Sequence, residues 1–174
     1  MLKYVVAAFL TAGVLASAQQ HGSQSTLKAV LLQQLRETHN QKNWFVSEKE
    51  AVAGLTPEQA AWSDGKNHSV GQLVQHLNFW NASNLARLAH RSAPQAGNND
   101  ETFTFAPAQW AATLKEFDQT MTAVEQFVES QDEGALEKIA PTIARIAQHN
   151  AYHIGEMVTS RKKQGTWNPD LGVK

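Results

Sequence analysis

The chain has 174 residues, 15 basic and 16 acidic side chains, a formal charge of −1 and no cysteine. Without cysteine, the sequence excludes disulfides, thiolate zinc sites, iron–sulfur clusters and a cysteine nucleophile. The balanced charge offers no basic surface for a nucleic-acid backbone or an anionic membrane, so neither is expected as a partner.

The first 18 residues are expected to be a signal peptide and not part of the fold. Lys3 precedes an apolar run from Tyr4 to Leu15, and Ala16-Ser17-Ala18 has the small residues that precede a signal-peptidase site. The run is shorter than the about 20 apolar residues of a membrane span. We therefore expect a periplasmic or secreted protein with one domain, residues 19–174, and no membrane contact after cleavage. An uncleaved N-terminal anchor is the alternative.

Four long stretches of this domain have helical periodicity and are separated by turn-forming residues. They run over about 25–53, 69–90, 110–128, and from 141 or 142 to 164. Ser69 is the expected N-cap of the second stretch, and Gly165 the expected stop of the fourth. Thr56-Pro57-Glu58 predicts a short additional helix, since proline suits the first helical position. Period-two runs typical of strands are absent, so the sequence predicts an all-α four-helix bundle.

Two of the seven histidines lie four residues apart in the fourth stretch. His149 and His153 project from one helical face, whose apolar neighbours include Ile146 and Met157. His76 has a similar apolar setting in the second stretch. Two nitrogens from one helix and a third from a facing helix can bind a divalent ion and leave a coordination position open. These three residues are the candidate metal ligands, and satisfied core histidines are the structural alternative.

The other four histidines are not assigned to the metal. His21 lies near the start of the expected mature chain, and His68 is most simply a loop residue before the Ser69 cap. His39 and His90 lack an apolar setting.

Two segments resemble the signatures of a known family. Residues 69–77 (SVGQLVQHL) and 148–156 (QHNAYHIGE) resemble the second-helix and fourth-helix signatures of the DinB-like metalloproteins. The order of a long first helix, a proline-containing connection and three further helices is similar too. The resemblance implies a DinB/YfiT-like bundle in which His76, His149 and His153 hold a divalent ion. Zinc or nickel is expected first, with manganese or iron as alternatives, and DNA binding is not implied.

The resemblance also implies a class of function. Characterised relatives include thiol-dependent S-transferases and isomerases, in which the metal would activate a low-molecular-weight thiol. We therefore expect a small-molecule substrate and a metal-dependent transferase or hydrolase that activates a thiol or water. The alternative is a non-catalytic bundle that binds metal or a small ligand as a carrier, sensor or interaction module. The sequence leaves a homodimer open.

Glu156 stands where many relatives carry glutamine, three residues after His153 on the same helical stripe. The simpler expectation is a surface carboxylate that balances Arg161 or Lys162. The alternative is a catalytic role for Glu156, either as an acceptor beside a ligand histidine or as a base acting on metal-bound water.

Overall fold

A computed structural model describes residues 26–172 of the chain, and the expected signal peptide lies outside them. The regular structure of these residues is helical throughout, without a strand. The all-α prediction is therefore confirmed. Within the same range no helix combines the length and the apolar character that crossing a membrane requires.

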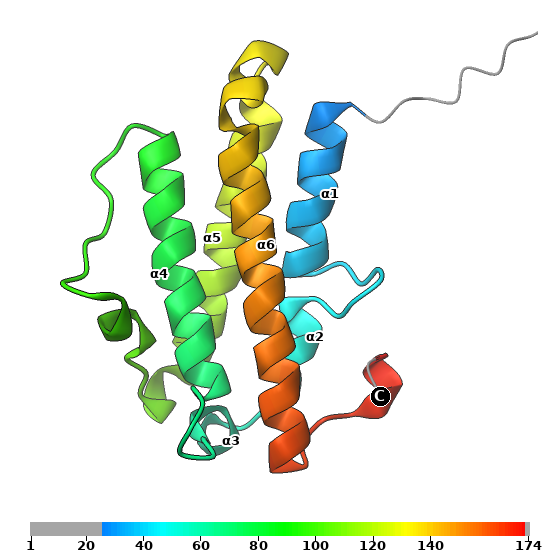
Figure 1. Cartoon of the computed structure of the whole chain (residues 1–174), viewed down its shortest axis with the longest axis vertical. Coiled ribbons are helices and arrows are strands. Elements are labelled where there is room, and N and C mark those ends of the chain that lie inside the picture. Colours follow the sequence, from blue (N-terminus) through cyan, green and yellow to red (C-terminus); the bar gives the residue numbers. More distant parts are fainter. Residues whose placement is uncertain (1–25, 173–174) are drawn as a thin grey trace, which may run out of the picture.

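Four long helices form the bundle: α1 (Leu27–His39), α4 (Val70–Leu88), α5 (Trp110–Ser130) and α6 (Glu133–Gln164). α1 and α6 run in one direction, and α4 and α5 run in the other (Figure 1). Both α5 and α6 pack against α1 and α4, so the four helices form a four-sided bundle. The short helices are α2 (Glu48–Val52), α3 (Pro57–Ala61), η1 (Asn99–Phe103), η2 (Pro107–Gln109) and η3 (Pro169–Leu171).

Side-chain caps fix several helix ends. The Ser69 hydroxyl accepts a hydrogen bond from the backbone N–H of Gln72 at 3.2 Å, and the Gln72 side chain accepts one from the N–H of Ser69 at 2.8 Å. Thr56 and Gln59 form the same reciprocal cap on α3. α6 ends at Gly165, which has a φ of 78° and takes the left-handed conformation that glycine tolerates best. These predicted caps and ends are confirmed.

The first predicted helix is wrong beyond His39. α1 ends there, its next residue Asn40 leaves the helical conformation, and residues 40–47 connect it to α2. Ser47 starts α2 with a capping box of its own, in which Glu50 accepts from the N–H of Ser47 at 3.0 Å. The apolar periodicity continues across this break. The chain nevertheless leaves the helix at Asn40, and the capping box of Ser47 starts a new one.

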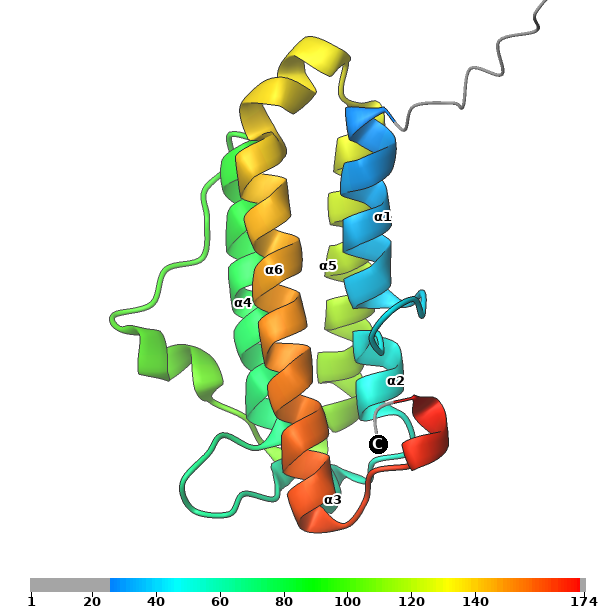
Figure 2. The ribbon, with the colours of Figure 1, turned by 45° about the vertical axis from the view of Figure 1, so that its right-hand side comes forward.

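The predicted start of the fourth helix at Pro141 or Thr142 is also wrong. Asp132 caps α6 by accepting a hydrogen bond from the N–H of Ala135 at 2.8 Å, and the helix continues through Pro141. A proline inside a helix removes one backbone hydrogen bond and bends the axis. Figure 2 shows the first turns of α6 inclined to the rest of the helix.

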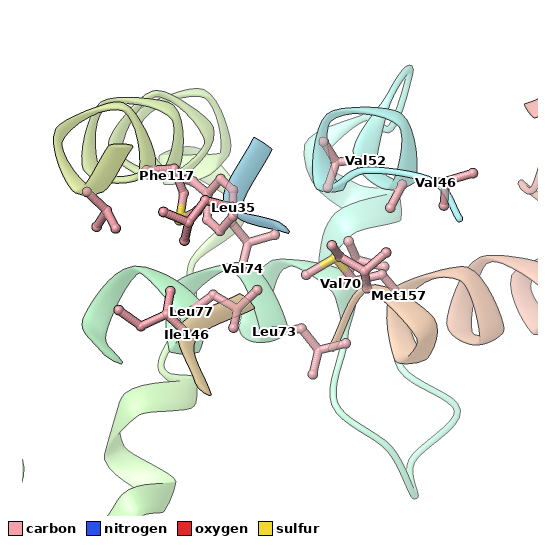
Figure 3. Packing of buried hydrophobic residues seen from close by; sticks show 14 of the residues in the cluster. Leu35, Val46, Val52, Val70, Leu73, Val74, Leu77, Phe117, Ile146 and Met157 are labelled. Carbon is pink, nitrogen blue, oxygen red and sulfur yellow. The ribbon is translucent and has the colours of Figure 1, made fainter. Parts of the chain in front are cut away.

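The core lies between the four long helices. Leu35 of α1, Leu77 of α4, Phe117 of α5 and Ile146 of α6 are fully or almost fully buried. Figure 3 shows Leu77 beside Ile146, and Phe117 beside Leu35. This packing holds α4 and α6 side by side, and it thereby sets the relative positions of the side chains that these two helices carry.

A long connection joins α4 to α5. Because these neighbouring helices run in the same direction, residues 89–109 return along the outside of α4 (Figure 1). The connection carries η1, which packs on α4. A Cβ at Gly71 would clash with the ring of Phe105, so glycine at this position of α4 allows the connection to lie directly on the helix.

Candidate metal centre

The three predicted ligands meet between α4 and α6. Nε2 of His76 lies 3.3 Å from Nε2 of His149, and Nε2 of His153 lies 3.0 Å from the same atom. One ring nitrogen from each residue lies within 4.8 Å of the other two. His76 and His153 are buried and His149 is half-buried. The pair on α6 and the single histidine on α4 therefore form one cluster, which we call the histidine cluster.

Two of the three nitrogen–nitrogen separations in this cluster fit a divalent ion. Metal–nitrogen bonds of about 2.1 Å hold neighbouring imidazole nitrogens about 3.0 Å apart in octahedral geometry and about 3.4 Å apart in tetrahedral geometry. The two Nε2 separations, 3.0 and 3.3 Å, lie in this range. The cluster is also the single group of three or more histidine or carboxylate residues with metal-ligand spacing within residues 26–172.

Hydrogen bonds at Nδ1 orient two of the rings. The Thr102 hydroxyl donates to the carbonyl oxygen of Asn99 at 2.6 Å, so it accepts at its 2.5 Å contact with Nδ1–H of His76. Nδ1–H of His153 donates to Oε2 of Glu156 at 2.6 Å. Both contacts place the hydrogen on Nδ1 and leave the Nε2 lone pair free. Metal-binding histidines characteristically have such a partner on the second ring nitrogen.

An aromatic stack holds the plane of His76. The ring of Phe103 lies 4.0 Å from that of His76 and 3.8 Å from that of His68, almost parallel to both. Trp80, one turn after His76, donates from Nε1 to the side chain of Asn99 at 3.3 Å. η1 therefore contacts the histidine cluster through the Thr102 hydroxyl and the Phe103 ring. These η1 residues were not among the predicted site residues, and the two phenylalanines of the connection, Phe103 and Phe105, are the sequence signal that could have pointed to them.

Two rings of the cluster, those of His76 and His149, are held in the neutral form that binds metal. Burial, followed by the nearby His153, His149 and His68 rings, lowers the pKa of His76 to about 3. Burial and then His153 lower the pKa of His149 to about 4, against the opposing charge of Glu156. His76 and His149 are therefore neutral near pH 7, and a neutral imidazole has the lone pair that a metal ion requires.

A pocket of 560 Å³ opens onto the histidine cluster from the groove between α4 and α6. Trp80 and Tyr152 line its sides, and the exposed Arg145 also lines it. A second pocket, of 470 Å³, shares Tyr152 with the first and is lined by Glu156 and Lys163. A small molecule can therefore reach the cluster from solvent.

Glu156 contacts His153 and not Arg161. The Arg161 guanidinium points inward, and it donates to the carbonyl oxygens of Ala51 and Thr166 at 2.8 Å each. Oε2 of Glu156 thus lies at hydrogen-bond distance from a histidine of the cluster, although the side chain is still 43% exposed.

The histidines outside the cluster have different surroundings. His39 is 2% exposed, and its ring nitrogens lie 2.8 Å from a carboxylate oxygen of Glu125 and 3.1 Å from one of Asp118. His39 was expected to lack an apolar setting; it is buried, and its ring nitrogens contact carboxylates of α5, which leave no trace in the local sequence. His90 is exposed just beyond α4, and His21 lies outside the described residues.

A family model covers the part of the chain that contains the histidine cluster. The model of the DinB superfamily matches residues 49–157, a range that includes the whole histidine cluster and Glu156. This chain belongs to the DinB superfamily. The family resemblance of segments 69–77 and 148–156 is therefore confirmed. No curated protein and no solved structure matches this DinB-superfamily chain.

Proposed function

We propose that this DinB-superfamily protein is a metal-dependent enzyme that acts on a small molecule with water or a thiol as the nucleophile. The observation that supports this proposal is the convergence of the Nε2 atoms of His76, His149 and His153 beside an open pocket. Structural zinc sites are closed by four protein ligands, whereas a set of three leaves room for a reactant. Zinc or nickel is the proposed ion, with manganese or iron as alternatives.

The chain contributes orientation and exclusion of water. When bound, a divalent ion supplies Lewis-acid chemistry and lowers the pKa of a water or thiol at the remaining coordination position. Thr102 and Glu156 hold the His76 and His153 rings through Nδ1. Because its Oε2 atom is already engaged by His153, Glu156 is proposed as a positioning residue. Phe103 covers one face of His76 and keeps water from it.

Tyr152 is a hydrogen-bond donor at the edge of the pocket. It is 65% exposed, and its ring lies 5.0 Å from that of His153. The negative charge of Glu156, followed by a hydrogen bond between the two side chains, raises the pKa of Tyr152, so the phenol keeps its hydrogen at neutral pH and a substrate would have to replace Glu156 as its acceptor. We propose that it donates to a substrate that occupies the pocket.

Export is part of the proposal, because residues 1–18 have the features of a signal peptide. The enzyme would then act in the periplasm or outside the cell. With no cysteine in the chain, any thiol in the reaction comes from a substrate.

Metal content tests the proposal directly. Protein without a histidine tag is incubated with zinc, nickel, manganese or iron, desalted and analysed for metal, as wild type, His149→Ala and His90→Asn. We expect about one equivalent in the wild type and in His90→Asn, and less than about a tenth of that in His149→Ala. His90→Asn is the control, because it removes an exposed histidine outside the cluster. Substoichiometric metal in the wild type would refute the proposal.

Thiol-transfer and hydrolysis screens then separate an enzyme from a carrier. We expect the metal-loaded wild type to turn over a small substrate in one of the two screens, and His149→Ala to be inactive there. A metal-loaded wild type without activity in either screen would favour the non-catalytic alternative.

A further inference from the structure

The pocket beside the histidine cluster has a cationic side chain on its lining. Arg145 lies four residues before His149 on α6, and both line this pocket. Other guanidinium groups of the protein are engaged: Arg36 pairs with Glu125 and Glu129, and Arg161 donates to backbone carbonyls. In the described part of the chain, Arg145 has no hydrogen-bond or ion-pair partner. Its five N–H donors are therefore available to a ligand.

The remaining lining of the pocket is neutral. It includes the amides of Asn84 and Asn99, the hydroxyl of Thr142 and the rings of Trp80 and Tyr152, and no aspartate or glutamate lines it. The second pocket is different, since Asp64, Glu156 and Lys163 all line it. Arg145 is therefore the one lysine or arginine on the lining of the first pocket, and no acidic side chain on that lining offsets its charge. A ligand with one negative charge complements this electrostatic environment.

The helix geometry gives the size of such a ligand. Four residues of an α-helix rise about 6 Å, which is the axial separation of Arg145 and His149. Trp80 lies one turn after His76 on the facing helix, so its ring lies beside the path between the guanidinium and the cluster. A ligand that bridges the two ends needs only a few atoms between its charged group and its reacting group. An apolar linker of that length fits against Trp80.

We propose that the substrate of this site is a small carboxylic acid whose carboxylate binds Arg145 while its reacting group lies at the histidine cluster. The inference rests on the proposed function, because it names the substrate class of the same site. The planar guanidinium fork matches a carboxylate in two parallel hydrogen bonds. A phosphate dianion fits less well, because the pocket offers a single guanidinium and neutral donors such as Asn84 and Thr142.

Calorimetric titration of the zinc-loaded protein tests this inference. The probes are phenylacetate, its neutral analogue phenylacetamide and inorganic phosphate. In the wild type, we expect phenylacetate to bind at least about tenfold more tightly than phenylacetamide or phosphate. Arg145→Gln should weaken phenylacetate binding at least about tenfold, the range of a lost charge-assisted hydrogen bond, and Arg145→Lys should weaken it less.

Arg87→Gln is the matched control. It removes the same charge from a guanidinium that lies 5.9 Å from the centre of the Trp80 ring. Arg87 itself does not line the pocket. We expect this variant to bind phenylacetate within about twofold of the wild type. An equal loss in Arg87→Gln and Arg145→Gln would overturn the assignment of the carboxylate to Arg145.

The same titration on chelator-treated protein separates this inference from the proposed function. Arg145-dependent binding that persists without metal supports the carboxylate subsite, even if the metal analysis refutes a metal centre. Phenylacetate binding that is equal in the wild type and Arg145→Gln would overturn the subsite, because the carboxylate would then bind elsewhere. Tighter binding of phosphate, or no binding of phenylacetate in either form of the protein, would overturn it as well.

Discussion

The hydroxyl of Thr102 lies 2.5 Å from Nδ1 of His76, and its own hydrogen is donated to the carbonyl of Asn99. The contact selects the tautomer of His76 in which Nε2 has the free lone pair. We predict that Thr102→Val, which keeps the shape and removes the acceptor, weakens zinc binding about 10-fold to 100-fold. A competitive chelator titration measures this loss. Thr104→Val, an exposed threonine two residues later, is the control and should bind zinc as the wild type does.

The contact between Glu156 and His153 gives a second prediction. Glu156→Ala removes the acceptor for Nδ1–H of His153 and should weaken zinc binding about 10-fold. Glu156→Gln keeps a carbonyl acceptor at the same reach and should stay within a few-fold of the wild type. If Glu156→Gln instead retains zinc but loses all turnover, the carboxylate acts as a base and the positioning role is wrong.

Glu48 gives a prediction for the pH dependence of stability. Burial, and secondarily the charge of Asp118, raises the pKa of Glu48 from 4.5 to about 8. The folded protein thus keeps a proton that the unfolded chain releases above pH 4.5. The stability that this group contributes is fully present below pH 4.5 and is lost as the pH rises to about 8.

Glu48→Gln should remove this part of the pH dependence. We expect the variant to exceed the wild type by on the order of 4 kcal/mol in free energy of unfolding at about pH 8, and to match it at about pH 4. Urea denaturation at several pH values measures the difference. Glu137→Gln removes an exposed carboxylate on α6 and should follow the wild type throughout. Parallel curves for Glu48→Gln and the wild type would contradict the raised pKa.

Two helical glycines should respond to alanine in opposite ways. A Cβ at Gly155 of α6 would have no atom within 4 Å, whereas a Cβ at Gly71 of α4 would clash with the ring of Phe105. Gly155→Ala should therefore stabilise the protein by about 0.5–1 kcal/mol, since alanine favours the helix. Gly71→Ala should destabilise it, because the connection after α4 must move away. Thermal denaturation of both variants checks the pair, and a stabilised Gly71→Ala would contradict the observed packing.

The helix ends that were predicted correctly are those that depend on local chemistry. Ser69, Thr56 and Gly165 mark caps or stops through their own side chains or backbone freedom, and the sequence shows each of them. At the end of α1 and the start of α6, local capping and the wider sequence pattern favour different helix boundaries. In both cases a cap, at Ser47 or Asp132, outweighs the apolar periodicity or the proline. Periodicity alone cannot rank these effects.

The histidine cluster was predictable, and Glu156 was already one of the alternatives for a partner, but Thr102 and Phe103 were not. His149 and His153 share a helical face by spacing, and His76 has apolar neighbours, so their convergence follows from the packing of two helices. Thr102 lies 26 residues after His76, in a connection whose path is set by tertiary contacts. His39 is a similar case, because its two carboxylate partners come from α5. Such contacts have no sequence period.

The parallel course of α4 and α5 has a consequence for how this architecture can diversify. The histidines are fixed by helices whose other faces build the core, so they tolerate little displacement. Residues 89–98 of the connection lie between α4 and the part of η1 that contacts His76. Insertions in this stretch lengthen a surface loop at low energetic cost. A protein with the same three histidines can therefore acquire a differently shaped entrance to the pocket without rebuilding its bundle.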